Sequence, residues 1–320
     1  MMKTVTVLGG SGFVGSSVVA RLDQAGYQVK VLTRRREQAK HLILLPNVQV
    51  VESDIHDQAA LKAQLQGSDV VINLIGILHQ TSDNGFEKMH HQFPRRVAQL
   101  CEELGIPRLL HMSALQASVN APSEYLRSKA AGDQAVLEFS KKLHVTIFRP
   151  SVIFGTRDRF INLFAKLIQA IPVLALAMPQ AKFQPIWVED VAAAMVNAVD
   201  EPATYGKTYE LGGPAIMTLQ QIMEAVMKTI NVQRPIIGLS LNMSLLQGSF
   251  MQLLPIKLLS RDNVKSMQVD NVCQQPMANE LCVVPTDMFA VISGYLVKNN
   301  PRGAYDQFRA AAGRVINARR

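Results

Sequence analysis

Residues 4–15 read TVTVLGGSGFVG, and this stretch decides the fold. Its first five residues form a short β-branched, apolar run that is typical of a buried strand. Residues 16–25 follow with helical spacing, because Val18, Val19 and Leu22 fall on one face. A strand, a glycine-rich turn and a helix in this order predict the start of a Rossmann-type βαβ unit.

The turn carries glycines at positions 9, 12 and 15, a G-x-x-G-x-x-G variant of the dinucleotide-binding loop. Gly9 permits the tight turn, Gly12 lets the backbone approach a pyrophosphate, and Gly15 lets the helix pack close to the strand. Free N–H groups at the helix start then attract the phosphate charge. An ordinary turn is the alternative. We predict that a nicotinamide dinucleotide contacts Gly9, Gly10, Ser11, Gly12, Phe13, Val14 and Gly15.

Further short apolar runs alternate with helical stretches along the first half of the chain. The strands are expected at residues 28–33, 48–52, 70–74, 109–112 and 145–148, and the helices at 57–66, 94–104 and 123–137. This alternation predicts an α/β fold with a doubly wound parallel sheet. We expect a Rossmann domain over residues 1–155 and 184–215, and a smaller, mostly helical C-terminal lobe over residues 156–183 and 216–320.

The second predicted strand ends in Thr33-Arg34-Arg35-Arg36. Domains that prefer NAD usually place Asp or Glu near this point to hold the ribose 2′-hydroxyl. Guanidinium groups pair instead with a 2′-phosphate, so we predict that NADP(H) is preferred over NAD(H), through Arg34 and Arg35. A solvated basic turn is the alternative. Residues after the third and fourth strands complete the predicted cofactor site: Asp54, Ile55, Leu74, Ile75 and Gly76.

A tyrosine and a lysine stand one helical turn apart, at Tyr125 and Lys129. Residues four apart share a helix face, and a neighbouring ammonium favours the phenolate form of a tyrosine. Tyr125 is therefore the predicted acid/base, and Lys129 the group that lowers its pKa. Ser113, at the end of the preceding strand, is the candidate for orienting a substrate oxygen, with Ser118 as its rival.

These motifs together resemble the short-chain dehydrogenase/reductase superfamily, in its extended and atypical branches. Three more matches follow in family order, at residues 148–155 (FRPSVIFG), 184–191 (QPIWVEDV) and 209–214 (YELGGP). The resemblance implies an NAD(P)-dependent oxidoreductase in which Tyr125, Lys129 and Ser113 are catalytic. It also implies that Lys129 holds the nicotinamide ribose and that Pro150 lines the cofactor site.

Within the superfamily, the chain is most similar to the nucleotide-binding accessory subunits of respiratory complex I and their bacterial relatives. Residues 125–130 (YLRSKA), 154–160 (FGTRDRF) and 258–264 (LLSRDNV) carry this narrower resemblance. It implies a tie to quinone chemistry or to the respiratory membrane, without implying turnover. Extended members commonly have Asn in the helix before the serine strand, where it supports a relay water; here we place His91 at that position.

The composition excludes several other classes of protein. The 320 residues are 48% hydrophobic and 18% charged, ample for a large core. The net charge of +8 is spread without a nucleic-acid motif, so no nucleic acid is expected. Three scattered cysteines indicate neither a disulfide framework nor a zinc site, and no metal site is predicted. Without a signal peptide or a spanning segment, we expect a cytoplasmic protein.

Two strongly apolar segments, residues 160–178 and 235–260, dominate the second lobe. They are interpreted as the core of a substrate lobe. Alternatively they form an apolar pocket, or a membrane-facing surface on which Lys166, Lys257 and Arg261 face anionic headgroups.

Two functions compete. The leading hypothesis is an NADP(H)-dependent oxidoreductase acting on a carbonyl or alcohol, with a lipophilic or quinone-related substrate. The alternative is a non-catalytic NADP(H)-binding protein that assembles with a respiratory or quinone-making complex, peripherally on the inner membrane.

Overall fold

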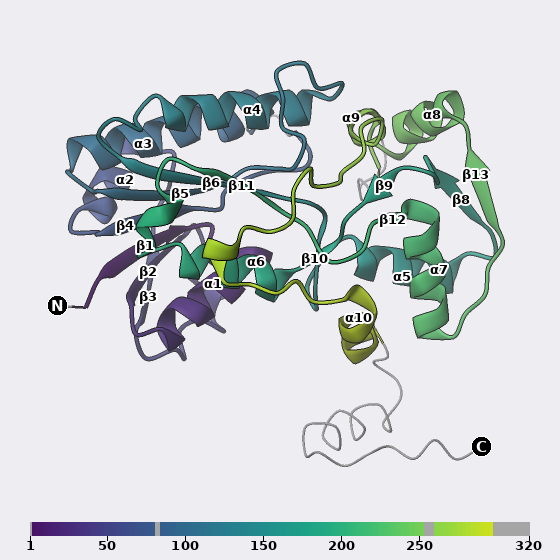
Figure 1. The fold of residues 1–320 in the computed structure, drawn as a ribbon, viewed down its shortest axis with the longest axis horizontal. Coiled ribbons are helices and arrows are strands. Elements are labelled where there is room, and N and C mark those ends of the chain that lie inside the picture. Colours follow the sequence, from purple (N-terminus) through teal and green to yellow (C-terminus); the bar gives the residue numbers. More distant parts are fainter. Residues whose placement is uncertain (1, 81–83, 253–258, 297–320) are drawn as a thin grey trace, which may run out of the picture.

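The computed structural model describes residues 2–80, 84–252 and 259–296. Its main feature is a seven-stranded sheet in the order β11-β6-β5-β4-β1-β2-β3, with all neighbouring strands parallel (Figure 1). The strands are β1 (Thr4–Leu8), β2 (Gln28–Thr33), β3 (Val48–Glu52), β4 (Val70–Asn73), β5 (Arg108–Met112), β6 (His144–Pro150) and β11 (Thr208–Leu211). The predicted Rossmann-type, doubly wound fold is confirmed.

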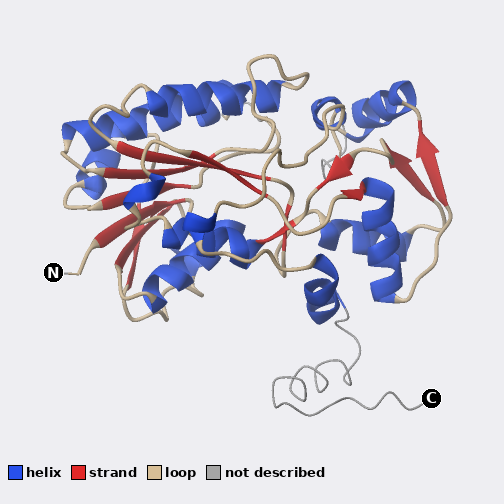
Figure 2. Ribbon diagram, viewed as in Figure 1, coloured by secondary structure: helices blue, strands red, loops and turns tan. Residues whose placement is uncertain are grey.

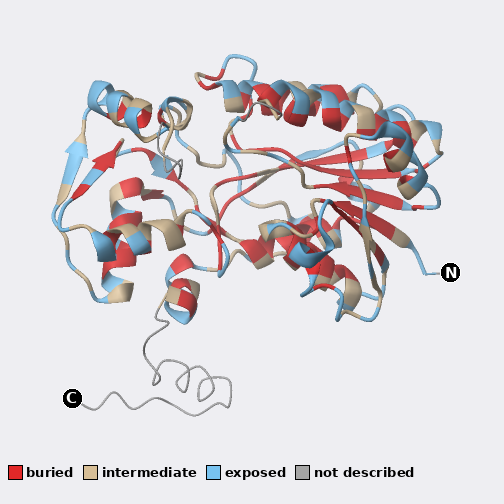
Figure 3. Ribbon diagram, turned by 180° about the vertical axis from the view of Figure 1, so that it is seen from behind, coloured by how far each residue is buried: buried red, intermediate tan, exposed pale blue. Residues whose placement is uncertain are grey.

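Helices cover both faces of this sheet (Figure 2). On one face lie α1 (Phe13–Gln24), η1 (Arg36–Ala39) and α6 (Val188–Asn197), and on the other α2 (Gln58–Leu65), η2 (Glu87–Gln92), α3 (Phe93–Glu103) and α4 (Glu124–Leu137). Strand residues alternate between the two layers: Val5 and Val7 pack toward α1, and Leu8 packs toward α3. The central strands are therefore buried on both sides (Figure 3).

The connection pattern places the cofactor loop at the centre of the sheet. From β1 the chain first adds β2 and β3 on one side, and then crosses back to add β4, β5 and β6 on the other. The loops after β1 and β4 therefore diverge, and in open α/β sheets this is where a ligand-binding crevice forms. The start of α4 follows β5 and lies near the same edge of the sheet.

A smaller lobe with its own core follows the sheet. Its helices are α5 (Ile161–Ala170), α7 (Leu219–Ile230), α8 (Leu241–Met251), α9 (Arg261–Ser266) and α10 (Met288–Leu296). Its short strands pair as β7 (Ile153–Phe154) with β10 (Ile186–Trp187), β9 (Lys182–Phe183) with β12 (Met217–Thr218), and β8 (Leu174–Ala177) with β13 (Ile236–Leu239). Between Met2 and Leu296, in the described ranges, no helix combines the length and apolarity needed to cross a membrane.

The expected domain boundaries stay a prediction, and one segment crosses them. Leu281, in η4 (Asn279–Leu281), packs into the core of the Rossmann domain beside α6. The Asn197 side chain holds it by donating to the Leu281 carbonyl at 2.8 Å. Lys257 and the segment beyond Leu296, which we assigned to the lobe, lie outside the described residues.

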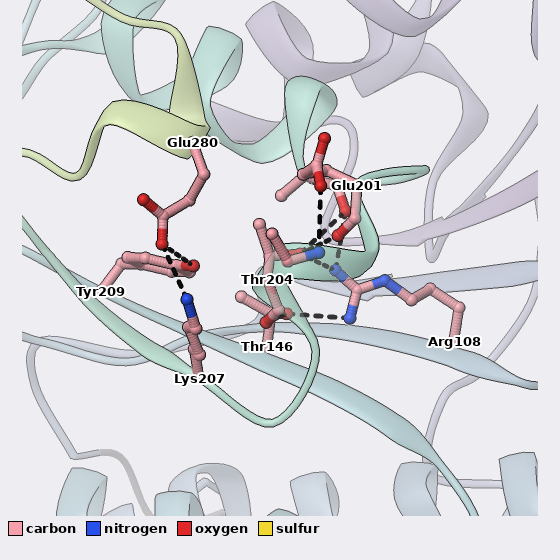
Figure 4. Close-up of polar contacts among 9 residues, drawn as sticks. Arg108, Thr146, Glu201, Thr204, Lys207, Tyr209 and Glu280 are labelled. Atoms are coloured by element: carbon pink, nitrogen blue, oxygen red, sulfur yellow. Dashed lines mark hydrogen bonds and ion pairs between the residues drawn. The ribbon is translucent and has the colours of Figure 1, made fainter.

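A buried arginine anchors the amino-terminal edge of the sheet (Figure 4). Arg108 is 3% exposed, and its guanidinium donates to the hydroxyls of Thr146 and Thr204, at 2.8 and 2.9 Å. It also donates to the carbonyl oxygens of residues 144, 198 and 199. Burial lowers the pKa of Arg108 to about 10. One side chain thus satisfies acceptors from β6, from the end of α6 and from η3 (Pro202–Thr204).

We expect Arg108→Lys to lower the free energy of unfolding by about 2–4 kcal/mol, because a lysine cannot serve five acceptors from one plane and leaves several buried without a donor. Urea denaturation measures this change. Lys207→Met is the matched control nearby: Lys207 pairs with Glu280 at a partly exposed position, so its loss should cost less than about 1 kcal/mol. Equal costs for the two variants would contradict the anchoring role.

Candidate cofactor and active site

The glycine loop has the close backbone packing that a diphosphate site requires. Gly9 adopts φ +83°, which makes the tight turn. A β carbon on Gly15 would lie 2.2 Å from the Gly9 carbonyl oxygen, so only glycine lets α1 approach the end of β1 this closely. Gly12 precedes α1 as its N-cap, and without a side chain it leaves the first N–H groups of the helix open to an anion.

An open cavity of about 540 Å³ lies where β2 and β3 end. Its lining residues are Arg34, Glu52, Ser53, Asp54, His56, Asn84 and Lys88. The structure thus brings together Arg34 and Asp54, two of the predicted cofactor contacts. Arg35 is exposed but does not line this cavity, and Ile55 is buried in the core beneath α2 and α3. The predicted cofactor contacts of Arg35 and Ile55 are therefore not supported by the lining of this cavity and stay predictions.

Tyr125 and Lys129 lie on the face of α4 that packs toward the sheet, as their spacing predicts. The Tyr125 ring meets the rings of Phe86 and His90 edge-on, at centroid distances of 5.8 and 5.4 Å. Burial raises the pKa of Tyr125 to about 12. The Lys129 ammonium donates to the Met112 carbonyl at 2.8 Å, and burial lowers its pKa to about 8. In this geometry burial therefore favours the neutral form of both side chains: the protonated phenol of Tyr125 and the uncharged amine of Lys129.

A neutral histidine, His90, joins three parts of the site. Its Nε2 accepts the Ile77 N–H at 3.0 Å, so its proton is on Nδ1, which lies 2.9 Å from the Ser128 hydroxyl. Ser128 in turn donates to the Tyr125 carbonyl at 2.7 Å. Burial, assisted by the charge of Lys129, lowers the pKa of His90 to about 3. His90 therefore ties the loop after β4 to α4.

His90, not His91, is the buried histidine, so our placement of His91 was wrong. His91 lies at the surface and contacts Glu87 at 2.8 Å. The segment Glu87–Gln92 is a π-helix, whose wider turn rotates successive side chains differently from an α-helix. Within this π-helix the buried residues are Met89 and His90.

A chain of buried polar side chains crosses the sheet beneath α4. The Asn73 amide donates to His111 Nδ1 at 3.2 Å, and His111 Nε2 faces Asp133 at 3.9 Å. Arg149 closes the chain, donating to Asp133 from Nε at 2.9 Å and Nη2 at 2.7 Å. Sequence reasoning missed these residues, although a polar residue inside an apolar strand, as at Asn73 and His111, is a signal that could have found them.

Ser113 lies beside this chain, not at an open surface. Its hydroxyl is buried and has no partner in hydrogen-bonding geometry among the described residues. It is still close enough to Asp133 to favour the carboxylate form, against the burial that raises the pKa of that acid. The role of Ser113 toward a substrate stays a prediction. Ser118, its rival, is exposed and accepts the Asn120 N–H.

The loop after β4 lies directly against the lysine. Ile75 N–H donates to the Asn73 side chain at 3.2 Å, which shapes the turn. A β carbon on Gly76 would lie 3.6 Å from both the Lys129 ammonium and His90 Nε2. Of the three predicted residues in this loop, Gly76 thus lies beside Lys129, whereas Leu74 and Ile75 lie against Gly9 of the glycine loop. Pro150 ends β6 with its carbonyl accepting the Leu115 N–H at 2.9 Å.

Comparison with known proteins gives one family and several relatives. The model of the NAD dependent epimerase/dehydratase family matches residues 5–212. The mitochondrial NADH dehydrogenase (ubiquinone) 1 alpha subcomplex subunit 9 of Arabidopsis thaliana is 40% identical over 228 residues, 68% of this chain and 56% of that protein. Ceramide reductase of Caulobacter vibrioides is 31% identical over 193 residues, 60% of this chain and 59% of that protein. The chain thus spans little more than half of these curated relatives.

Among solved structures, the NADPH-dependent quinone oxidoreductase QOR2 of Escherichia coli, complexed with NADPH, superposes with a TM-score of 0.73. The alignment covers 89% of this chain and 97% of that one at 19% identity, so the likeness concerns the fold. The matched segment begins within β1 and takes in the glycine loop, Tyr125 and Lys129. Family and loop geometry together support binding of a nicotinamide dinucleotide. The chain therefore belongs to the NAD dependent epimerase/dehydratase family.

Proposed function

We propose that this protein is an NADP(H)-binding accessory protein, in which the cofactor is held mainly to stabilise the fold and that assembles with a respiratory membrane complex. The observation that carries the proposal is the backbone packing of the Gly9–Gly15 turn, which leaves the start of α1 open to a diphosphate. Burial also raises the pKa of Tyr125, so the phenol keeps its proton at neutral pH. The complex I subunits among the relatives support the assembly role.

The residues present fit a dinucleotide at the carboxyl ends of β1 and β4. The glycine loop would hold its pyrophosphate, and Lys129 would reach the nicotinamide ribose by giving up the Met112 carbonyl. When bound, the dinucleotide can donate or accept a hydride. Preference for NADP(H) is supported by Arg34, which lines the cavity after β2 and carries the charge that a 2′-phosphate pairs with.

The second candidate function is reduction of a lipophilic carbonyl. Tyr125 packs against Phe86 and against an apolar cluster of Ala114, Ala121 and Leu126, surroundings that favour an apolar substrate. A phenol with a raised pKa is a poor base but can still donate a proton to a developing alkoxide, so reduction is the favoured direction. His90, fixed by its bonds to Ile77 and Ser128, would hold the Tyr125 ring in place through their edge-on contact. Ceramide reductase, a relative by sequence, supports a lipid-like substrate class.

Replacing Arg34 and Arg35 together by alanine is expected to weaken NADPH binding roughly 10- to 100-fold, because Arg34, which lines the cavity, would lose a charge-assisted hydrogen bond worth about 1.5–3 kcal/mol. NADH binding should be unchanged, since NADH has no 2′-phosphate. Titration by nucleotide fluorescence measures both constants. Arg36→Ala is the matched control and should bind both cofactors as the wild type does. Equal weakening of NADH and NADPH, or tighter NADH binding by the wild type, would contradict the cofactor assignment.

Tyr125→Phe and Gly15→Ala separate the two candidate functions. In an accessory role, Tyr125→Phe retains the thermal stabilisation by NADPH and complements a deletion strain, because only the phenolic oxygen is lost. Gly15→Ala should abolish both, since the added methyl group collides with the Gly9 carbonyl. Ser17→Ala, on the same helix, is the control for stability. Failure of Tyr125→Phe to complement, with its NADPH stabilisation intact, would instead support the reductase.

We further propose that the accessory protein lies at a membrane surface through α8. This helix exposes Met243, Leu246 and Phe250, spaced three and four residues apart on one face, with fractional exposures of 55, 68 and 73%. The sequence between Glu224 and Asp262 contains four basic residues, Lys228, Arg234, Lys257 and Arg261, and no acidic residue. An exposed apolar helix face in a basic part of the chain suits a bilayer with anionic headgroups.

Leu246→Gln combined with Phe250→Gln should reduce co-sedimentation with phosphatidylglycerol-containing vesicles at least several-fold, because two large apolar side chains no longer enter the bilayer interface. Val284→Gln is the control, since Val284 is 89% exposed but lies outside α8. The wild type should also bind less at high salt. Vesicle binding that is equal in all three proteins would overturn the assignment of α8.

A further inference from the structure

The first turn of α4 depends on a residue from the smaller lobe. A helix leaves its first N–H groups without partners inside the helix. In α4, the side chain of Ser123 accepts the Leu126 N–H at 3.3 Å. The two N–H groups before it both go to Asp262: Oδ1 accepts from Glu124 at 2.8 Å and Oδ2 accepts from Tyr125 at 3.0 Å. The carboxylate also opposes the positive end of the helix dipole.

Asp262 is held rigidly enough to play this part. It lies in the first turn of α9, beyond the start of α4 (Figure 1), and α9 begins with a capping box between Ser260 and Asn263. The next helix in the lobe, α8, packs against the same backbone: a β carbon on Gly248 would lie 2.9 Å from the Ser260 carbonyl carbon. Helices α8 and α9 therefore form one unit, and this unit presents Asp262 to α4.

We propose that Asp262 is a positioning residue for Tyr125. Tyr125 is the second residue of α4, and the ends of helices fray when their N–H groups lack acceptors. Its ring keeps its place beside Phe86 and His90 only while this first turn stays helical. Asp262 acts through the backbone, because its two oxygens bind the N–H of Tyr125 and of the residue before it. The smaller lobe thereby sets the position of the aromatic side chain in the Rossmann domain.

An apolar contact from the same part of the lobe also supports a positioning role. Val269, which follows α9, packs against the same small apolar cluster as Tyr125, formed by Ala114, Ala121 and Leu126. The cap and the apolar contact come from one segment of the lobe, so a shift of α9 would change the backbone and the surroundings of Tyr125 together. This inference uses the proposed function only to say why the position of Tyr125 matters.

The test follows Tyr125 itself, in the full-length protein labelled with 3-fluorotyrosine. Fluorine NMR resolves the tyrosines, and Tyr125→Phe assigns the resonance. In Asp262→Ala we expect the Tyr125 signal to shift and its titration midpoint to fall by about one pH unit, a roughly tenfold change in ionisation constant, because a frayed first turn admits water to the phenol. Asp262→Asn, which keeps one acceptor oxygen, should fall between the wild type and Asp262→Ala.

Asp270→Asn is the matched control, since Asp270 follows α9 in the chain but pairs with Lys182 at the surface. Its Tyr125 resonance and titration should equal those of the wild type. A Tyr125 signal in Asp262→Ala that matches the wild type overturns the proposal. If Asp262→Ala does not fold, Asp262→Asn decides by the same criterion. Absence of NADPH binding by the wild type would overturn the proposed function but would leave this result standing.

Discussion

The contact between α1 and the end of β1 is the constraint on which the rest of the structure depends. Because Gly15 has no side chain, the helix backbone reaches the Gly9 carbonyl, and the first N–H groups of α1 come to the carboxyl edge of the sheet. The same contact aligns α1 with α6 on one face and leaves the opposite face to α3 and α4. The crevice between the loops after β1 and β4 follows from this arrangement.

Beneath the loop after β4, several buried polar side chains are hydrogen-bonded to one another. His90 and Asn73 use side-chain acceptors to hold the backbone of this loop, and both also bond to a second buried side chain. The charge of the Asp133 carboxylate is balanced by Arg149, which donates two hydrogen bonds to one of its oxygens. Buried polar groups arranged in this way stabilise one geometry, because each would be costly to leave without its partner.

The pKa shifts at the site have a common cause. Burial disfavours charge, so it raises the pKa of Tyr125 and lowers those of Lys129 and His90. Burial of this kind favours proton donation by the phenol over proton abstraction. The smaller lobe contributes to the burial, since Asp262 and Val269 lie against the start of α4.

Local sequence pattern was enough to determine the βαβ start, the glycine loop and the shared face of Tyr125 and Lys129. Each of these depends on spacing within a few residues, and the geometry of a strand or helix converts that spacing directly into direction. Tertiary structure alone decided the rest. Which of His90 and His91 is buried was settled by the packing of the π-helix Glu87–Gln92. Asp262 binds the Tyr125 N–H, 137 residues away in the chain, because the packed lobe brings its carboxylate to the start of α4. A hydrogen bond between distant segments leaves no periodic trace in the sequence, because its partners are selected by the fold and not by their neighbours in the chain.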